Sequence, residues 1–167
     1  MYPRGRPVVP DFDPTERLFL RYQLTHWVVG QLAPTGIRFN GKSGVSVNRS
    51  QFGLPEDTLF HEEGRYNGLG VVQFLVADIP LRVDPDSDKG ESGEPYRFRL
   101  KHVPLDVEAD PTEVEINYAH SEIWSHRADS TEVDPAHRDP GKTIQVSFKI
   151  RLCQRIRQEQ ICIEAAL

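Results

Sequence analysis

The sequence predicts a single α+β domain built on a mixed, mostly antiparallel sheet with a few short helices. Short runs of β-branched and aromatic residues recur along the chain, one segment near the C-terminus carries a helical stripe, and loops rich in Asp, Ser, Gly and Pro separate these segments. The length of 167 residues suits one domain with a substantial core. We therefore expect one compact domain over residues 15–167.

An extended arm is expected before this domain, because residues 1–14 contain four prolines and no periodicity. Such an arm lies either on the domain or on a partner. The elements expected next are a strand at 18–24, a helical turn or bend near Trp27, short strands at 37–39 and 44–47, and a short helix from Pro55. The helix is predicted because Pro-Glu-Asp places acidic residues in its first turn.

The clearest strand in the chain covers residues 71–76, which are apolar on both faces, as in a central strand covered on both sides. Residues 82–95 and 128–141 are rich in turn-forming residues, and we expect surface loops there. Segments 96–108 and 113–124 alternate between polar and apolar residues, which indicates half-exposed strands.

The segment 142–157 is compatible with two structures. Its apolar residues alternate as in a strand, whereas Ile144, Phe148, Leu152 and Ile156 also follow the i, i+4 spacing of a helix. We favour a helix followed by a terminal strand in 160–167, because residues 155–160 contain no turn signal for a hairpin.

The composition narrows the classes of partner. The formal net charge is −5 and no long basic run occurs, so duplex nucleic acid is not expected as a partner. No apolar stretch of about 18 residues is present, so we expect no membrane span. The N-terminal segment lacks the apolar core of a secretory signal. The oligomeric state is not predicted.

The two cysteines, Cys153 and Cys162, form no CxxC pair. They are too few for a zinc ribbon or a disulfide scaffold, and we expect buried, inert thiols. A cytoplasmic location is the simplest interpretation.

The first candidate site residues lie in the segment Ser-Val-Asn-Arg-Ser at 46–50. On a strand, Ser46 and Asn48 share one face and Arg49 belongs to the other. A hydroxyl, an amide and a guanidinium are suited to hold a phosphate or a carboxamide. The alternative is that Asn48 and Ser50 form a turn and Arg49 is solvated.

The second candidate pair is His120 and Glu122, which share one face of a strand and combine a base with an orienting carboxylate. In the alternative, they only bond each other or a backbone group. With His126 or His137 they would also supply three metal ligands. No HxH or HExxH motif is present, so no metal cofactor is expected.

Arg21 lies inside an apolar strand. An arginine there is costly unless it is paired or directed at a ligand. It either forms an ion pair with Glu122 or Glu16 or binds a pyrophosphate.

The order of Arg21, Ser46 and Glu122 along the chain resembles that of ADP-ribosyltransferases. The resemblance implies that Arg21 holds the phosphates of NAD, that the Ser46 strand shapes the nicotinamide pocket, and that Glu122 contacts the ribose. The family's Ser-Thr-Ser triplet is Ser-Val-Asn here, and its Glu-x-Glu or Gln-x-Glu is His-Ser-Glu. The resemblance therefore implies NAD as a cofactor without implying arginine as the acceptor.

The segments 44–49, 55–60, 71–79 and 120–123 are also similar to those of small uncharacterised bacterial proteins from toxin or defence neighbourhoods. That resemblance implies a compact α+β fold with one pocket built from Arg21, Arg49, His120 and Glu122. Two functions follow as expectations. One is an NAD-binding transferase or glycohydrolase of a toxin or defence system. The other is a non-enzymatic protein-interaction module, or an accessory subunit of a larger assembly, with a protein partner encoded nearby.

Overall fold

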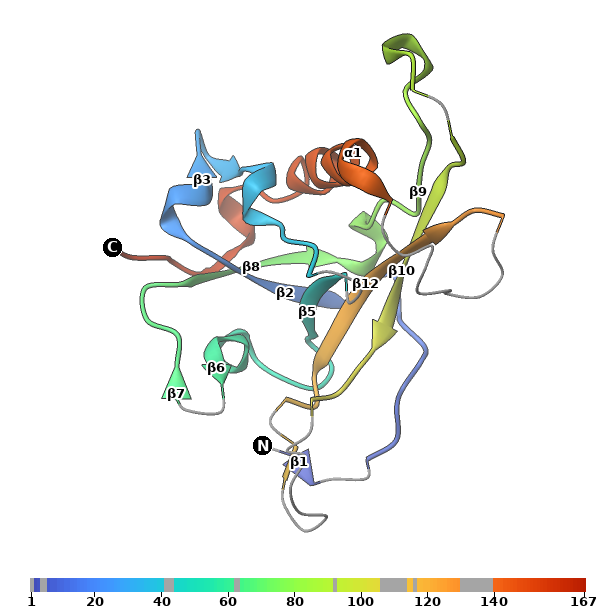
Figure 1. Ribbon diagram of the computed structural model, residues 1–167. Helices are drawn as coiled ribbons and strands as arrows, with labels where there is room; N and C mark the ends of the chain where they lie inside the picture. Colours follow the sequence, from blue (N-terminus) through green and yellow to red (C-terminus); the bar gives the residue numbers. More distant parts are fainter. Residues whose placement is uncertain are drawn as a thin grey trace.

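A seven-stranded sheet runs through the computed structural model of this protein (Figure 1). The structure describes residues 2–3, 6–40, 44–61, 64–91, 93–105, 114–115, 117–129 and 140–167. The strand order is β13-β8-β2-β5-β12-β10-β9, and the strand pairs in it are antiparallel. The α+β fold class is confirmed.

The strands of this sheet are β2 (Arg17–Tyr22), β5 (Val45–Arg49), β8 (Gly70–Leu75), β9 (Arg82–Val83), β10 (Tyr96–His102), β12 (His120–Arg127) and β13 (Ile161–Ile163). Three smaller sheets pair β1 (Tyr2–Pro3) with β11 (Val114–Glu115), β3 (Trp27–Val28) with β4 (Gln31–Leu32), and β6 (Phe60–His61) with β7 (Gly64–Arg65). Short 3-10 helices are η1 (Leu24–His26), η2 (Pro34–Gly36), η3 (Pro55–Leu59), η4 (Val76–Asp78), η5 (Ser87–Lys89) and η7 (Gln158–Gln160). The helix α1 spans Gly141–Cys153.

The helix α1 covers one face of the sheet (Figure 1). Its buried stripe is Ile144, Phe148 and Leu152, and Phe148 stacks on Phe98 of β10 at 4.2 Å between ring centroids. The helix expected from the i, i+4 spacing is confirmed, and so is the terminal strand, β13. The strand-like alternation arises because Val146 and Ile150 are also apolar, although they are 40% and 44% exposed.

The opposite face of the sheet carries a smaller apolar cluster and a row of polar residues. Phe19, Leu59 and Val71 form the cluster where η3 packs on β2 and β8. Polar side chains occupy many of the other positions of this face. These include the candidate residues Arg21, Ser46, Asn48, His120 and Glu122, which the strand register places on one face.

Several expected elements take a different form. No strand forms at 37–39, since Ile37 follows η2 directly and its side chain is buried in the core. The helix from Pro55 is a 3-10 helix that gives way to β6 at Phe60. The strand expected at the centre is β8, which is second from an edge, although apolar clusters cover both of its faces.

Other boundaries shift because tertiary pairing ends a strand before its pattern does. The strand expected at 18–24 ends at Tyr22, and η1 follows as the expected helical turn. The loop expected at 82–95 begins with the edge strand β9. The strand expected at 113–124 is interrupted by a turn at 118–119 before β12. Most of the loop expected at 128–141 lies outside the described residues.

The described part of the N-terminal arm lies on the domain. The backbone N–H of Val9 donates to Nδ1 of His102 at 2.9 Å, and the Tyr118 hydroxyl donates to the carbonyl of Pro7. Among the described residues, the structure contains no helix of the length and hydrophobicity needed to cross a lipid bilayer.

Candidate functional site

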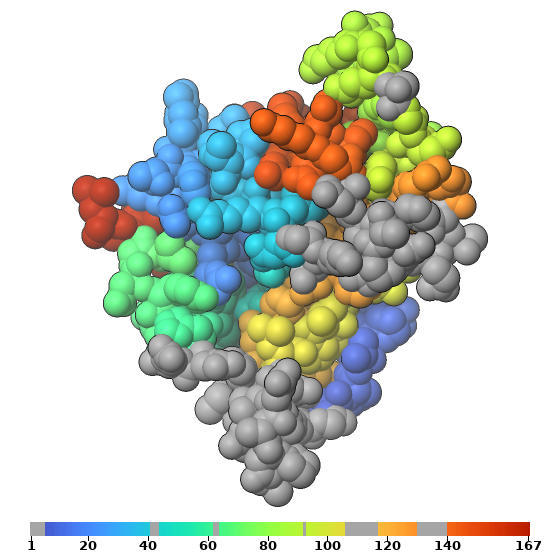
Figure 2. Space-filling model, in the orientation of Figure 1, coloured from blue at the N-terminus to red at the C-terminus, as the bar shows by residue number. Residues whose placement is uncertain are grey.

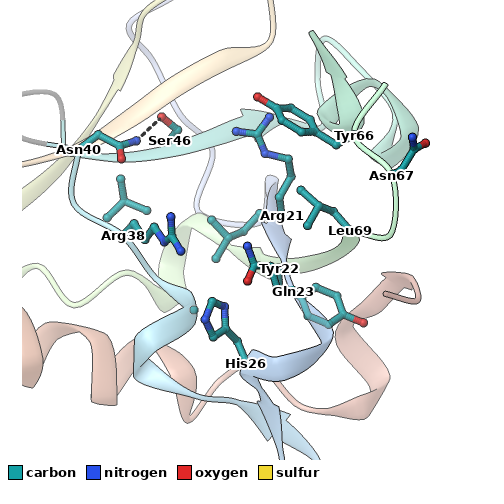
Figure 3. A pocket seen from close by; sticks show the side chains of 13 residues that line it. Arg21, Tyr22, Gln23, His26, Arg38, Asn40, Ser46, Tyr66, Asn67 and Leu69 are labelled. Carbon is teal, nitrogen blue, oxygen red and sulfur yellow. Dashed lines mark hydrogen bonds between the residues drawn. The ribbon is translucent and has the colours of Figure 1, made fainter. Parts of the chain in front are cut away.

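The candidate site opens where two neighbouring strands separate. β5 pairs with β12 from Val45 to Asn48, but with β2 only at Asn48 and Arg49. Between the unpaired parts of β2 and β5 lies a cavity of about 410 Å³, drawn in Figure 3. Ligand cavities in proteins commonly have volumes of about 300–1,000 Å³. Its lining residues are Leu20, Arg21, Tyr22, Gln23, His26, Gly36, Arg38, Asn40, Val45, Ser46, Tyr66, Asn67 and Leu69.

A second cavity of about 200 Å³ adjoins the first, because Arg21, Ser46 and Tyr66 line both. It extends along β5 towards β12 and is lined as well by Val47, Asn48, Thr58, Phe60, His61, Leu105, Asn117 and His120. In the space-filling view the surface is recessed here, between the light-blue segment near residue 38, the green segment near residue 66 and the yellow end of β10 (Figure 2). We call the two together the Arg21 groove.

Arg21 lies at the junction of the two cavities. Its guanidinium packs over the ring of Tyr66, with 4.4 Å between Cζ and the ring centroid (Figure 3). Nη1 donates a long hydrogen bond of 3.4 Å to the carbonyl of Thr58. Neither Glu122 nor Glu16 pairs with it, so of the sequence alternatives for Arg21 the ion pair is not formed. Its charge is directed into the groove.

The described lining of the groove is rich in hydrogen-bond donors and positive charge. Arg21 and Arg38 contribute guanidinium groups, and His26 lines the same cavity (Figure 3). None of the described lining residues of either cavity is Asp or Glu. Because charges in a concave site reinforce one another, this arrangement favours an anion.

Ser46 and His120 form a hydrogen-bonded pair inside the groove. Nε2 of His120 lies 3.3 Å from Oγ of Ser46, and Nδ1 donates to the carbonyl of Val103 at 2.6 Å. Burial lowers the pKa of His120, although the bond to Val103 and the negative charge of Glu122 oppose this shift. The ring is therefore neutral at pH 7.

Asn48 lines the second cavity with an amide that is already engaged. Its Nδ2 donates to Oγ1 of Thr58 at 3.3 Å, and its Oδ1 accepts from Nδ2 of Asn117 at 2.8 Å. These bonds hold the amides of Asn48 and Asn117 in fixed orientations along the cavity wall.

Arg49 lies outside both cavities, in contrast to Ser46, Val47 and Asn48 of the same strand. Its side chain is fully buried and forms an ion pair with Glu16 at 2.8 Å. Its Nη atoms also donate to the carbonyls of Val9 and Asp11, both at 2.7 Å, and to Oε1 of Gln51. The guanidinium expected to hold a phosphate instead fastens the arm to the sheet.

Glu122 shares the sheet face but lines neither cavity. Its Oε2 accepts a hydrogen bond of 2.6 Å from the indole N–H of Trp124. It does not orient His120 by a direct bond, since the two ring nitrogens contact the Val103 carbonyl and the Ser46 hydroxyl. The structure thus brings Arg21, Ser46, Asn48 and His120 into one groove and leaves Glu122 at its side.

The alternative metal site does not form within the described residues, which contain no group of three or more metal-binding side chains. Nδ1 of His126 interacts with the neighbouring Arg127 carbonyl at 3.0 Å. His137 lies outside the described residues.

Several lining residues carried no motif in the sequence, among them Arg38, Asn40, Tyr66 and Asn117. Tyr66 belongs to the segment Tyr-Asn-Gly-Leu-Gly, in which the glycines signal a turn but not the aromatic ring that faces Arg21. Arg38 follows the Pro and Gly of η2, so loop composition concealed it. Comparisons with protein-family models, curated proteins and solved structures found no match to this chain.

Proposed function

We propose that this protein binds a small phosphate-bearing ligand in the Arg21 groove, with NAD and ADP-ribose as the ligands to test first. The observation that carries the proposal is the charge of the groove: two arginines line it, and no described lining residue is acidic. A dinucleotide presents two adjacent phosphates and flat rings, which suit guanidinium groups and an aromatic side chain.

Each part of such a ligand has a counterpart in the groove. Arg21 and Arg38 bind the phosphates, because guanidinium groups donate to phosphate oxygens in pairs. Tyr66 is 38% exposed and offers a ring for stacking. Ser46 and Asn48 supply the hydroxyl and amide that a carboxamide would bind.

An NAD-using transferase or glycohydrolase is the enzymatic form of this proposal. Loss of nicotinamide leaves an oxocarbenium-like sugar, which a carboxylate stabilises electrostatically. Glu122 is a candidate carboxylate on this sheet face, and the charges of both Glu122 and Arg21 act on His120. Turnover then requires Glu122 to exchange its bond with Trp124 for a ribose hydroxyl.

The experiment is a thermal-shift titration of the full chain with NAD, ADP-ribose and inorganic pyrophosphate. A ligand at a hundredfold its Kd adds about 2.7 kcal/mol to the free energy of unfolding. Arg21→Ala should abolish the shift. Arg155→Ala is the matched control, because that arginine is exposed and lines neither cavity.

The outcomes separate binding from catalysis. Stabilisation that Arg21→Ala removes and Arg155→Ala retains supports the ligand site. Release of nicotinamide that Glu122→Gln suppresses supports the enzymatic form, whereas binding without release restricts the proposal to ligand binding. No stabilisation by any of the three compounds contradicts the proposal.

A cytoplasmic location is part of this proposal. NAD is available there, and a reducing compartment keeps cysteines unpaired. Both Cys153 and Cys162 are free in the structure. A role in a toxin or defence system is the biological setting that we propose for the enzymatic form.

A second candidate function is that of a protein-interaction module, with a partner encoded nearby. The observation in its favour is Val29, at the turn between β3 and β4, which has a φ of 50° and is 96% exposed. A β-branched residue is strained in this conformation, and Val28 beside it is also exposed. A strained, exposed apolar residue at a turn is typical of a surface that binds another protein.

A photo-crosslinker at position 29 tests this second function in cells of the source organism. A specific crosslinked protein, lost when the crosslinker is moved to exposed Ser87 of η5, supports the module. Val29→Gly should raise the melting temperature by relieving strain. Crosslinking that is equal at both positions contradicts it.

A further inference from the structure

The Ser46–His120 pair has the hydrogen-bond polarity of a nucleophile and its base. A carbonyl oxygen only accepts hydrogen bonds, so Nδ1 of His120, which lies 2.6 Å from the Val103 carbonyl, carries the proton. In the neutral ring, Nε2 then carries a lone pair. The Ser46 hydroxyl, whose Oγ is 3.3 Å away, donates to it. This distance is slightly above the range of about 2.6–3.2 Å for such pairs, which are often longer without substrate.

The strands and neighbouring side chains around Ser46 and His120 hold the two residues in this hydrogen-bonded arrangement. His120 is 7% exposed and extends from the first position of β12, and the neighbouring strand β5 holds Ser46. The other hydrogen bond to Oγ of Ser46 comes from Nδ2 of Asn40, at 3.4 Å. An amide donor beside the hydroxyl is positioned to stabilise negative charge on an oxygen bound near Oγ.

Ser46 is also accessible from the groove. It lines both cavities and is only half-buried, whereas its base is buried and lines the second cavity alone. Arg21 lines the same two cavities. A ligand whose anionic group binds Arg21 therefore has its remaining atoms close to Ser46. The groove therefore combines an anion-binding group with an activated hydroxyl.

We propose that Ser46 and His120 catalyse acyl transfer from small esters that carry a negative charge. The choice of anionic substrates rests on the proposed function, since it assigns the anionic group to Arg21. The nucleophile and base do not depend on it.

The reaction proceeds in two balanced halves. Oγ of Ser46 bonds to the ester carbonyl carbon while its proton passes to Nε2 of His120. The bond from that carbon to the leaving oxygen then breaks, and Nε2 returns the proton to the leaving alcohol. The oxygen of a water molecule next bonds to the acyl carbon while its proton passes to Nε2. The bond from that carbon to Oγ then breaks, which releases the acid, and Nε2 returns the proton to Oγ of Ser46.

The test compares two chromogenic esters on the full chain, neutral p-nitrophenyl acetate and anionic mono-p-nitrophenyl succinate. We expect release of p-nitrophenol with an acyl adduct that peptide mapping locates on Ser46, and faster acylation by the succinate ester. Ser46→Ala should abolish the adduct. His120→Gln should slow acylation by about 100-fold or more, the usual contribution of a general base. Ser87→Ala is the matched serine control, since Ser87 is exposed in η5.

Two further variants keep the result interpretable. Ser46→Cys retains a nucleophile at the same place, so its adduct should appear at position 46 even if Ser46→Ala unfolds. Arg21→Ala should remove the preference for the succinate ester, so that the ratio of the acylation rates of the two esters falls to about one.

The outcomes distinguish catalysis by the Ser46–His120 pair from anion binding by Arg21. No adduct at position 46 in folded wild type and Ser46→Cys overturns the pair, and so does an adduct that His120→Gln leaves unchanged. Acylation of Ser46 at equal rates by both esters supports the pair but contradicts anion binding. Stabilisation by ADP-ribose without any acylation supports ligand binding and overturns the pair.

Discussion

Val9 and His102, 93 residues apart in the sequence, are joined by a hydrogen bond of 2.9 Å from the Val9 backbone N–H to Nδ1 of the imidazole. Nε2 of the same ring donates to the Tyr118 carbonyl at 2.6 Å. In the neutral ring, Nε2 donates a hydrogen bond and Nδ1 accepts one. A proton on Nδ1 would therefore break the bond to the arm. The attachment of the arm is therefore coupled to pH.

We predict that stability falls below neutral pH. Burial is the largest cause that lowers the pKa of His102, and nearby Arg49 and His120 lower it further, although the bond to Tyr118 opposes the shift. A histidine whose folded-state pKa lies below its unfolded value of about 6.5 contributes full stability above that pH. That contribution is lost as the pH falls from the unfolded pKa towards the folded pKa, because the unfolded chain binds the proton more tightly.

Melting temperatures measured between pH 8 and pH 5 check this prediction, together with hydrogen exchange at the Val9 amide. Exchange should speed up at the acidic end. His102→Asn keeps an acceptor near the Nδ1 position but does not titrate, so its stability should depend less on pH than that of the wild type. An unchanged pH dependence in this variant would contradict the prediction.

The buried ion pair of Arg49 and Glu16 should be indispensable to the fold. Arg49→Met leaves the Glu16 carboxylate buried without its partner and frees two arm carbonyls, so we expect a loss of about 3–5 kcal/mol. Arg49→Lys should rescue only part of this, because an ammonium lacks the guanidinium fork. Urea unfolding measures the change.

The matched control for this variant is Arg82→Met, since Arg82 forms an exposed ion pair with Asp84 at the same 2.8 Å. Exposed pairs contribute about 0–1 kcal/mol. Equal losses of unfolding free energy in the two variants would show that burial does not determine how much the Arg49–Glu16 pair stabilises the fold.

Removal of the Tyr66 ring should weaken ligand binding without unfolding the chain. Arg21 packs over this ring, and a contact of this kind at an exposed site is worth about 0.5–1 kcal/mol. We expect Tyr66→Leu to raise the Kd for ADP-ribose by about 2–5-fold. Calorimetric titration measures it, with Tyr66→Phe as the control that keeps the ring. Equal weakening in both variants would assign the effect to the hydroxyl.

Alanine substitutions along α1 should separate its two faces. Phe148→Ala empties a fully buried position and should cost about 3–5 kcal/mol. Val146→Ala and Ile150→Ala change residues that are 40% and 44% exposed, so each should cost about 1 kcal/mol or less. Similar losses at all three positions, measured by chemical unfolding, would instead match a strand with one buried face.

Local periodicity predicted the elements of the fold better than their ends. The stripe of Ile144, Phe148 and Leu152 predicted α1 because helical spacing acts within one segment. Ile37 was misassigned to a strand, because a buried apolar residue after a 3-10 turn has the same composition as a short strand. Strand ends depend on pairing partners, which lie elsewhere in the chain.

The sequence also predicted only part of the candidate site, namely which side chains share a face of their strand. Ser46 and Asn48 were expected to share a face, and so were His120 and Glu122, since side chains alternate along a strand. The register that sets Ser46 opposite Glu122 and Asn48 opposite His120 is a property of the β5–β12 pair. Arg49 was expected at the ligand because its sequence neighbours are polar, whereas the distant arm binds it.

The sequence by itself determined the α+β class, the helix near the C-terminus and the faces on which the candidate polar residues lie. These properties follow from spacing within a segment. Only the tertiary structure decided that Ser46 meets His120, that Arg21 faces Tyr66 and that Arg49 fastens the arm. Contacts between residues 40 or more positions apart depend on strand order and on the energy of the whole core, and no local pattern encodes either.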